Sequence, residues 1–191
     1  MTVSTETAQN PAQYSKGLIW LHWGMAALVV TAYIAVWSHE YFPRGSTERA
    51  FAMTTHFTVG LSVLLLVMLR LFVRSRQETP LIRPEPPVWQ QSAATLAHVA
   101  LYATMIAMPI LGWLTLSAAG KPIPFFGLTL PPLIAENKDL GKQIKEIHET
   151  LGTIFYLLIG LHVAAAIYHH VVAKDNTLAR MAPVATQDGN A

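Results

Sequence analysis

Hydrophobic residues in this chain gather into four long runs separated by polar links. Formal charges are absent from residues 17–37, 88–120 and 150–173, and the run that starts at Ala50 ends in an arginine cluster beginning with Arg70. A helix needs about 20 consecutive apolar residues to cross the hydrocarbon core of a bilayer. The pattern therefore predicts four membrane-spanning helices, at about residues 17–37, 50–70, 92–116 and 146–172.

The polar segments between these runs set the domain organisation. We expect residues 15–174 to form one all-α membrane domain, a bundle of four transmembrane helices, with polar tails at residues 1–14 and 175–191. The proline-rich link at residues 80–87 favours an extended conformation. The loop at residues 119–142 is predicted to lie as a cap on the bilayer surface.

Composition agrees with a membrane protein and excludes several kinds of site. The chain has 191 residues, of which 52% are hydrophobic and 13% charged, a balance typical of membrane proteins. It contains no cysteine, which excludes disulfides, iron–sulfur clusters and cysteine-attached haem. A net charge of +2 gives no indication of nucleic-acid binding.

Histidines concentrate in the last apolar run, which holds four of the eight. His148 and His162 are fourteen residues apart, which places them within about 40° of one helix face at a rise of about 21 Å. His169 lies seven residues further on the same face, and the adjacent His170 points about 100° away. Ionisable groups inside a bilayer usually face the bundle interior. An interhelical hydrogen bond explains one such histidine, but several at two depths favour haem iron.

The depths of the histidines predict their pairing. With alternating helix directions, His22 lies at the level of His162, and His56 at the level of His148. We therefore predict two bis-histidine sites for non-covalent haem b, His22/His162 and His56/His148, about 21 Å apart along the fourth helix. A small residue follows each histidine by one turn, which gives clearance for a flat macrocycle: Ala26, Gly60, Gly152 and Ala166.

Two further histidines are candidates for a quinone site. A haem with both axial positions filled transfers electrons instead of binding substrate at iron. His98 and His169 lie in the same half of the membrane as the chain termini, where a neutral imidazole can hydrogen-bond a quinone carbonyl and pass protons. The alternative interpretation for each is an interhelical hydrogen bond or a contact with a haem propionate.

Several local sequences resemble the bacterial dihaem cytochrome b561 family, of the superoxide oxidase type. They are LHW at 21–23, FPRG at 42–45, FGLTLP at 126–131, HETLG at 148–152, GLHVAAAIYHH at 160–170 and KDNTLARM at 174–181. The resemblance covers about residues 14–182. In such proteins the haem b ligands match His22, His56, His148 and His162. The resemblance also implies a quinone site near His169 and an inner-membrane location with both termini in the cytoplasm.

The function implied by this resemblance is oxidation of superoxide to oxygen at the periplasmic face, with electrons passing through two b haems to ubiquinone. Membrane lipid, quinone and superoxide are the expected partners. Six cations on the periplasmic side of this topology would attract the anion: Arg44, Arg49, Lys121, Lys138, Lys142 and Lys145. The alternative is a cytochrome b subunit that docks a dehydrogenase or hydrogenase and reduces quinone. A haem-free structural membrane protein is the third hypothesis, which a Soret absorption band would exclude.

Overall fold

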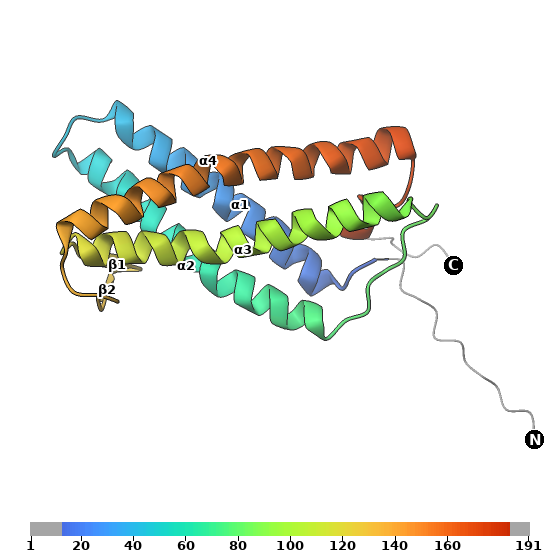
Figure 1. Ribbon diagram of the computed structural model, residues 1–191, viewed down its shortest axis with the longest axis horizontal. Helices are drawn as coiled ribbons and strands as arrows, with labels where there is room; N and C mark the ends of the chain where they lie inside the picture. The colour runs from blue at the N-terminus through green and yellow to red at the C-terminus, as the bar shows by residue number, and fades with distance from the viewer. Residues whose placement is uncertain (1–12, 184–191) are drawn as a thin grey trace, which may run out of the picture.

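Four long helices run along the long axis of the molecule in alternating directions and form the bundle (Figure 1). The computed structural model describes residues 13–183. Its long helices are α1 (Lys16–Ser38), α2 (Thr47–Ser75), α3 (Val88–Ala118) and α4 (Lys138–Tyr168). Each is long and apolar enough to cross a membrane. The prediction of an all-α bundle of four transmembrane helices is therefore confirmed.

Short elements join and finish the helices. They are η1 (His39–Tyr41), β1 (Ile123–Phe125), β2 (Leu128–Leu130), η2 (His169–Ala173) and η3 (Ala179–Met181). The two strands form an antiparallel hairpin at the bundle end where α1 passes into α2, which we call the hairpin end (Figure 1). The opposite end, where α1 begins and α4 finishes, is the termini end.

Polar side chains at the first residue before a helix explain where the helices begin. The hydroxyl of Ser46 accepts from Arg49 N at 3.2 Å before α2, and the amide oxygen of Asn137 accepts from Leu140 N at 3.0 Å before α4. Such caps satisfy backbone N–H groups that have no partner within the helix. Because Asn137 caps it, α4 begins eight residues before the predicted span at residue 146. His148 therefore lies well inside the helix.

The loop at residues 119–142, predicted as a surface cap, has more structure than expected. The β1–β2 hairpin returns to α3, where Leu133 N donates to Ser117 Oγ at 3.0 Å and Trp113 Nε1 donates to Pro131 O at 3.0 Å. Ile123 packs with the buried side chains of Leu61 and Leu116. The hairpin therefore closes the hairpin end of the bundle between α2 and α3.

Part of the C-terminal segment predicted as a polar tail is folded against the bundle. Residues 1–12 and 184–191 of the two tails lie outside the described residues, but residues 175–183 fold back onto the termini end. Tyr14 N donates to Arg180 O at 3.2 Å, and Trp23 Nε1 donates to Met181 O at 2.8 Å. Asp175 and Arg180 are both only 8% exposed. This segment is part of the fold because its polar side chains are buried against the helix ends.

The helices pack as two pairs, which leaves room between them. α1 lies along α2, α3 lies along α4, and α2 also touches α3. Side chains bridge the wider gap between α1 and α4, where the ring of Tyr33 lies 6.4 Å from that of Phe155 and its hydroxyl donates to Gly152 O at 2.7 Å. The four histidines predicted as haem ligands lie partly buried between these pairs.

Candidate functional site

Two pairs of histidine rings face each other inside the bundle. The ring centres of His22 and His162 are 6.2 Å apart, and those of His56 and His148 are 6.3 Å apart. A metal–imidazole bond of about 2 Å plus about 1 Å from nitrogen to ring centre gives about 6 Å between two rings on opposite sides of one ion. Both pairs thus have the spacing that a bis-histidine iron requires. Their role as haem ligands stays a prediction.

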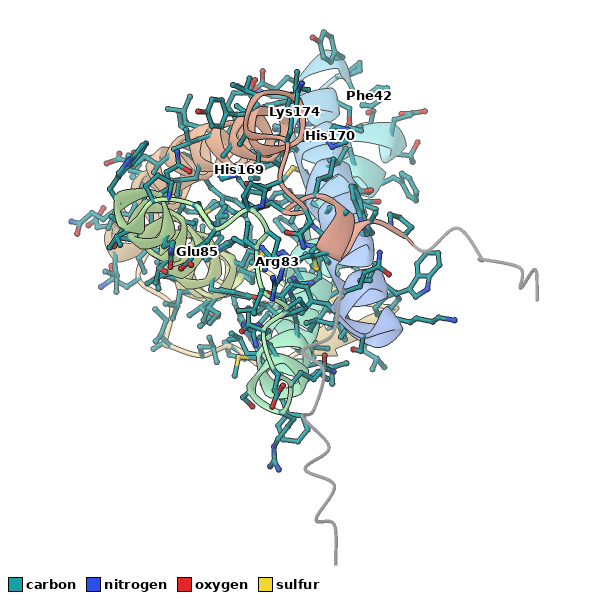
Figure 2. All side chains as sticks on the ribbon, turned by 90° about the vertical axis from the view of Figure 1, so that its right-hand side faces the viewer. Phe42, Arg83, Glu85, His169, His170 and Lys174 are labelled. Atoms are coloured by element: carbon teal, nitrogen blue, oxygen red, sulfur yellow. The ribbon has the colours of Figure 1, made fainter. Side chains whose placement is uncertain are left out.

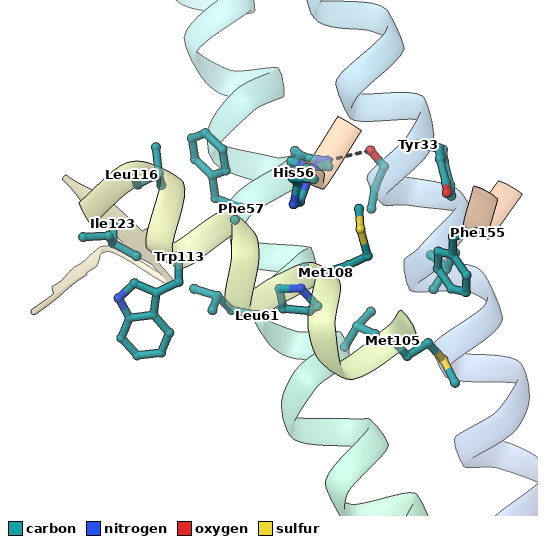
Figure 3. Close-up of a pocket in the computed structure, with 17 residues that line it drawn as sticks. Tyr33, His56, Phe57, Leu61, Met105, Met108, Trp113, Leu116, Ile123 and Phe155 are labelled. Atoms are coloured by element: carbon teal, nitrogen blue, oxygen red, sulfur yellow. Dashed lines mark hydrogen bonds between the residues drawn. The ribbon is translucent and has the colours of Figure 1, made fainter. Parts of the chain in front are cut away.

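The His56/His148 pair borders an apolar cavity toward the hairpin end (Figure 3). The space that the cavity outlines, including solvent at its open mouth, is about 720 Å³. Nδ1 of His56 lies 2.9 Å from Ala32 O, and because a carbonyl oxygen only accepts, the ring proton is on Nδ1. Nε2 of His56 therefore keeps its lone pair. This backbone contact is the usual one for a metal-binding histidine, since it fixes the ring and its tautomer.

Glycines keep the wall of this cavity flat. Gly60 and Gly112 both line it, and a Cβ built on Gly60 would meet no atom within 4 Å. A Cβ at Gly60 would therefore stand in open space, and a larger side chain there would occupy part of the cavity. The apolar lining, the open glycine wall and the histidine spacing together fit a haem b with His56 and His148 as axial ligands.

This geometry gives a first testable prediction. Gly60→Leu is expected to lower the haem content of the purified protein from about two per chain to about one, because the new side chain occupies the cavity of a single site. Pyridine haemochrome absorbance measures the ratio, and circular dichroism checks that the helices remain. Gly160→Leu is the matched control, since Gly160 is exposed on α4 and its Cβ also meets nothing within 4 Å. Equal haem content in the two variants would contradict the placement.

A third histidine joins the pair at the termini end. The ring of His98 lies 5.6 Å from that of His162, although much of the His98 side chain is exposed at the surface of α3. Arg70 of α2 is buried in the same half of the bundle, near enough for its charge to act on His22, His98 and His162. The site near the termini therefore contains a buried cation as well as imidazoles.

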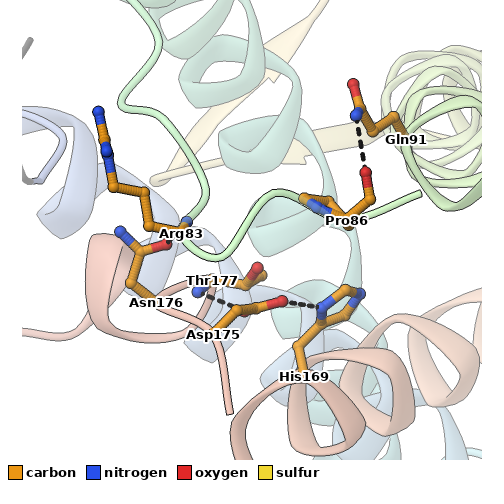
Figure 4. A network of polar contacts seen from close by, with 7 residues as sticks. All are labelled: Arg83, Pro86, Gln91, His169, Asp175, Asn176 and Thr177. Atoms are coloured by element: carbon orange, nitrogen blue, oxygen red, sulfur yellow. Dashed lines mark hydrogen bonds and ion pairs between the residues drawn. The ribbon is translucent and has the colours of Figure 1, made fainter. Parts of the chain in front are cut away.

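His169 is held by a carboxylate that lies six residues later in the chain (Figure 4). Its Nδ1 is 2.5 Å from Oδ2 of Asp175, and the two side chains are 16% and 2% exposed. Burial raises the pKa of Asp175, but hydrogen bonds from His169 and Thr177 outweigh this effect, so the net pKa lies below the usual value. Asp175 is therefore a carboxylate that accepts the Nδ1–H of His169. Nε2 of His169 remains available to another partner.

The chain conformation after α4 makes this contact possible. Residues His169–Ala173 widen into a π-helix, and Lys174 adopts a left-handed conformation with φ 53°, which turns Asp175 back toward His169. Asn176 then joins the segment to the proline-rich link: its Oδ1 accepts from Arg83 N at 2.8 Å. Figure 2 looks onto this end and shows His169 and His170 together with Arg83 and Glu85 of the link. π-Helical turns are frequent at functional sites.

Sequence reasoning missed two residues of these sites. The sequence places Asp175, in KDNTLARM, within a polar tail, and it places Arg70 in a basic cluster that closes the second span. A signal for Arg70 was present, since it follows His56 by fourteen residues, the same spacing as His148 and His162. The structure brings His98 to His162, whereas His169 binds Asp175. A quinone site at His98 and His169 stays a prediction.

Comparisons with known proteins agree with this architecture. The family model described as prokaryotic cytochrome b561 matches residues 13–183. Cytochrome b561 homolog 1 of Escherichia coli (strain K12) is 40% identical over 90% of this chain and 97% of its own length. Probable superoxide oxidase CybB of Yersinia pestis is 36% identical over 90% of this chain and 96% of its own. With four membrane-spanning helices and these relatives, the chain belongs to the prokaryotic cytochrome b561 family of haem b-binding membrane electron-transfer proteins.

Proposed function

We propose that the protein oxidises superoxide at the hairpin end and reduces ubiquinone at the termini end, with two b haems between them. The observation that carries the proposal is the pair of histidine sites at two levels of one bundle, separated by about 21 Å along α4. The likeness to a relative described as a probable superoxide oxidase supports the choice of electron donor. Haem iron with two histidine ligands supplies one-electron transfer.

Individual cations at the hairpin end would attract an anion, but fewer of them are unpaired than the six that the sequence offers. Arg49 donates to His39 O at 2.6 Å and Phe42 O at 3.2 Å, and Lys138 and Lys145 lie 3.6 Å and 2.5 Å from glutamates. The remaining three cations are exposed and form no ion pair within residues 13–183: Arg44, Lys121 and Lys142. We propose that these three attract superoxide locally, because exposed acidic residues at the same end offset the net charge: Glu40, Glu48, Asp139 and Glu146.

Quinone reduction needs protons as well as electrons, and we propose that His169 delivers them. Two superoxide anions give two molecules of oxygen and two electrons, and ubiquinone takes up these electrons and two protons to form ubiquinol. With Asp175 accepting from Nδ1, Nε2 of His169 donates to a quinone carbonyl only in the imidazolium form, in which both ring nitrogens carry a proton. We place the termini end in the cytoplasm of a bacterial inner membrane, where water supplies the protons.

Stopped-flow mixing of purified protein with superoxide and a soluble ubiquinone tests the proposal. We expect both haems to be reduced and then reoxidised, with about one oxygen released per superoxide. Spontaneous dismutation releases only one oxygen per two superoxide anions, so the ratio distinguishes the two reactions. Haems that dithionite reduces and superoxide does not would overturn the proposal, and would favour a subunit that receives electrons from a partner dehydrogenase.

A further inference from the structure

Arg70 is a buried guanidinium near the middle of the termini half of the bundle. It is 8% exposed. Its Nε donates to Tyr102 Oη at 3.0 Å and its Nη1 donates to Leu18 O at 3.0 Å. Both acceptors are neutral, and no carboxylate of residues 13–183 lies within ion-pair distance of Arg70. A buried charge normally has an opposite charge as its partner, since an unpaired one is costly to remove from water.

The position of Arg70 on α2 places it at the level of the His22/His162 site. It follows His56 by fourteen residues, so it returns to nearly the same face about 21 Å further along the helix. His162 follows His148 on α4 by the same interval. At the termini end α1 and α4 therefore present His22 and His162, while α2 presents a cation at that level. The electrostatic effect of Arg70 on both histidines agrees with this placement.

Among the described residues, no arginine acts electrostatically on the two histidines of the hairpin-end site. The charged residues that act on His148 are Lys145 and Glu149. They form an ion pair of 2.5 Å with each other, so their fields largely cancel at the histidine. The two histidine sites thus have similar ring spacing but different electrostatic surroundings.

We propose that Arg70 is the counter-charge for a carboxylate of the termini-end haem and raises the reduction potential of that haem above the potential of the other. Ferrous haem carries one more electron than ferric haem, so a nearby cation stabilises the reduced form. Electrons that enter at the hairpin end then run downhill to the side where quinone is reduced. The inference rests on the two-haem arrangement of the proposed function, but not on superoxide as the donor.

Redox titration of single-haem proteins tests this role. The His148→Ala background should retain the termini-end haem. In this background Arg70→Gln is expected to lower the midpoint potential by at least about 59 mV, which is a tenfold change in the equilibrium constant for one-electron reduction. In a His162→Ala background, which should retain the other haem, the same change should leave the midpoint unaltered. Arg76→Gln is the control, since Arg76 is exposed at the end of α2.

The outcomes separate charge from a purely structural contact. Arg70→Lys keeps the cation but loses the planar fork, so we expect a midpoint near that of the unsubstituted protein. Equal midpoints for Arg70→Gln and Arg76→Gln would overturn the proposal. Loss of the haem in both Arg70→Gln and Arg70→Lys would also overturn it. Arg70 would then have a structural role, in which its hydrogen bonds hold α1 and α3 together. Loss in Arg70→Gln alone, with a normal midpoint in Arg70→Lys, would support it. The titration uses dithionite, so failure of superoxide oxidation leaves its result intact.

Discussion

His162→Ala is expected to lower the haem content of the purified protein from about two per chain to about one. The substitution removes a predicted axial ligand from the termini-end site and leaves His56 and His148 at their separation of 6.3 Å. A bis-histidine haem held non-covalently depends on both ligands. Pyridine haemochrome absorbance gives the ratio, and low-temperature EPR shows whether the remaining haem is six-coordinate and low-spin.

Two companion variants make this result specific. His148→Ala should also leave about one haem, in this case at the termini end, whereas His39→Ala should keep two, since His39 bonds to Val36 O outside both pairs. His98 lies 5.6 Å from His162, so His98→Ala/His162→Ala is included to test whether His98 contributes to the same site. Two low-spin haems in that double variant would contradict the pairing.

His169→Ala is expected to leave the haem spectrum nearly unchanged and to slow reoxidation of the haems by ubiquinone by roughly a hundredfold, the effect of losing a general acid. His169 lies about 10 Å along the helix from His162, too far to bind the same iron. Superoxide should still reduce the haems at the normal rate. Stopped-flow absorbance follows the two phases separately.

Neighbouring residues provide the controls for this prediction. His170 is exposed, so His170→Ala should reoxidise normally. Asp175→Asn removes the carboxylate that accepts from Nδ1 of His169, so it should slow reoxidation while leaving haem content at about two. If His170→Ala reoxidises slowly and His169→Ala at the normal rate, the quinone is bound by His170 and the assignment to His169 is wrong. Normal rates in both would remove this end of α4 from the quinone site.

The main architecture was predictable because it depends on properties local to each helix. Hydrocarbon thickness sets the length of an apolar run, and the helical repeat sets which residues share a face. The spacing of fourteen residues between His148 and His162, together with alternating helix directions, was enough to place histidines at two levels. The structure then brings His22 to His162 and His56 to His148.

Contacts between segments were decided only by the tertiary structure. Asp175 reaches His169 because η2 is a π-helix and Lys174 is left-handed, which no periodic pattern indicates. The long side chain of Arg70 was equally able to extend toward water at the helix end, but Tyr102 and Leu18 hold it inside the bundle. Apolar periodicity gives the depth of a residue and its face on one helix. Its partners depend on how the neighbouring helices rotate and pack, and that is a property of the whole bundle.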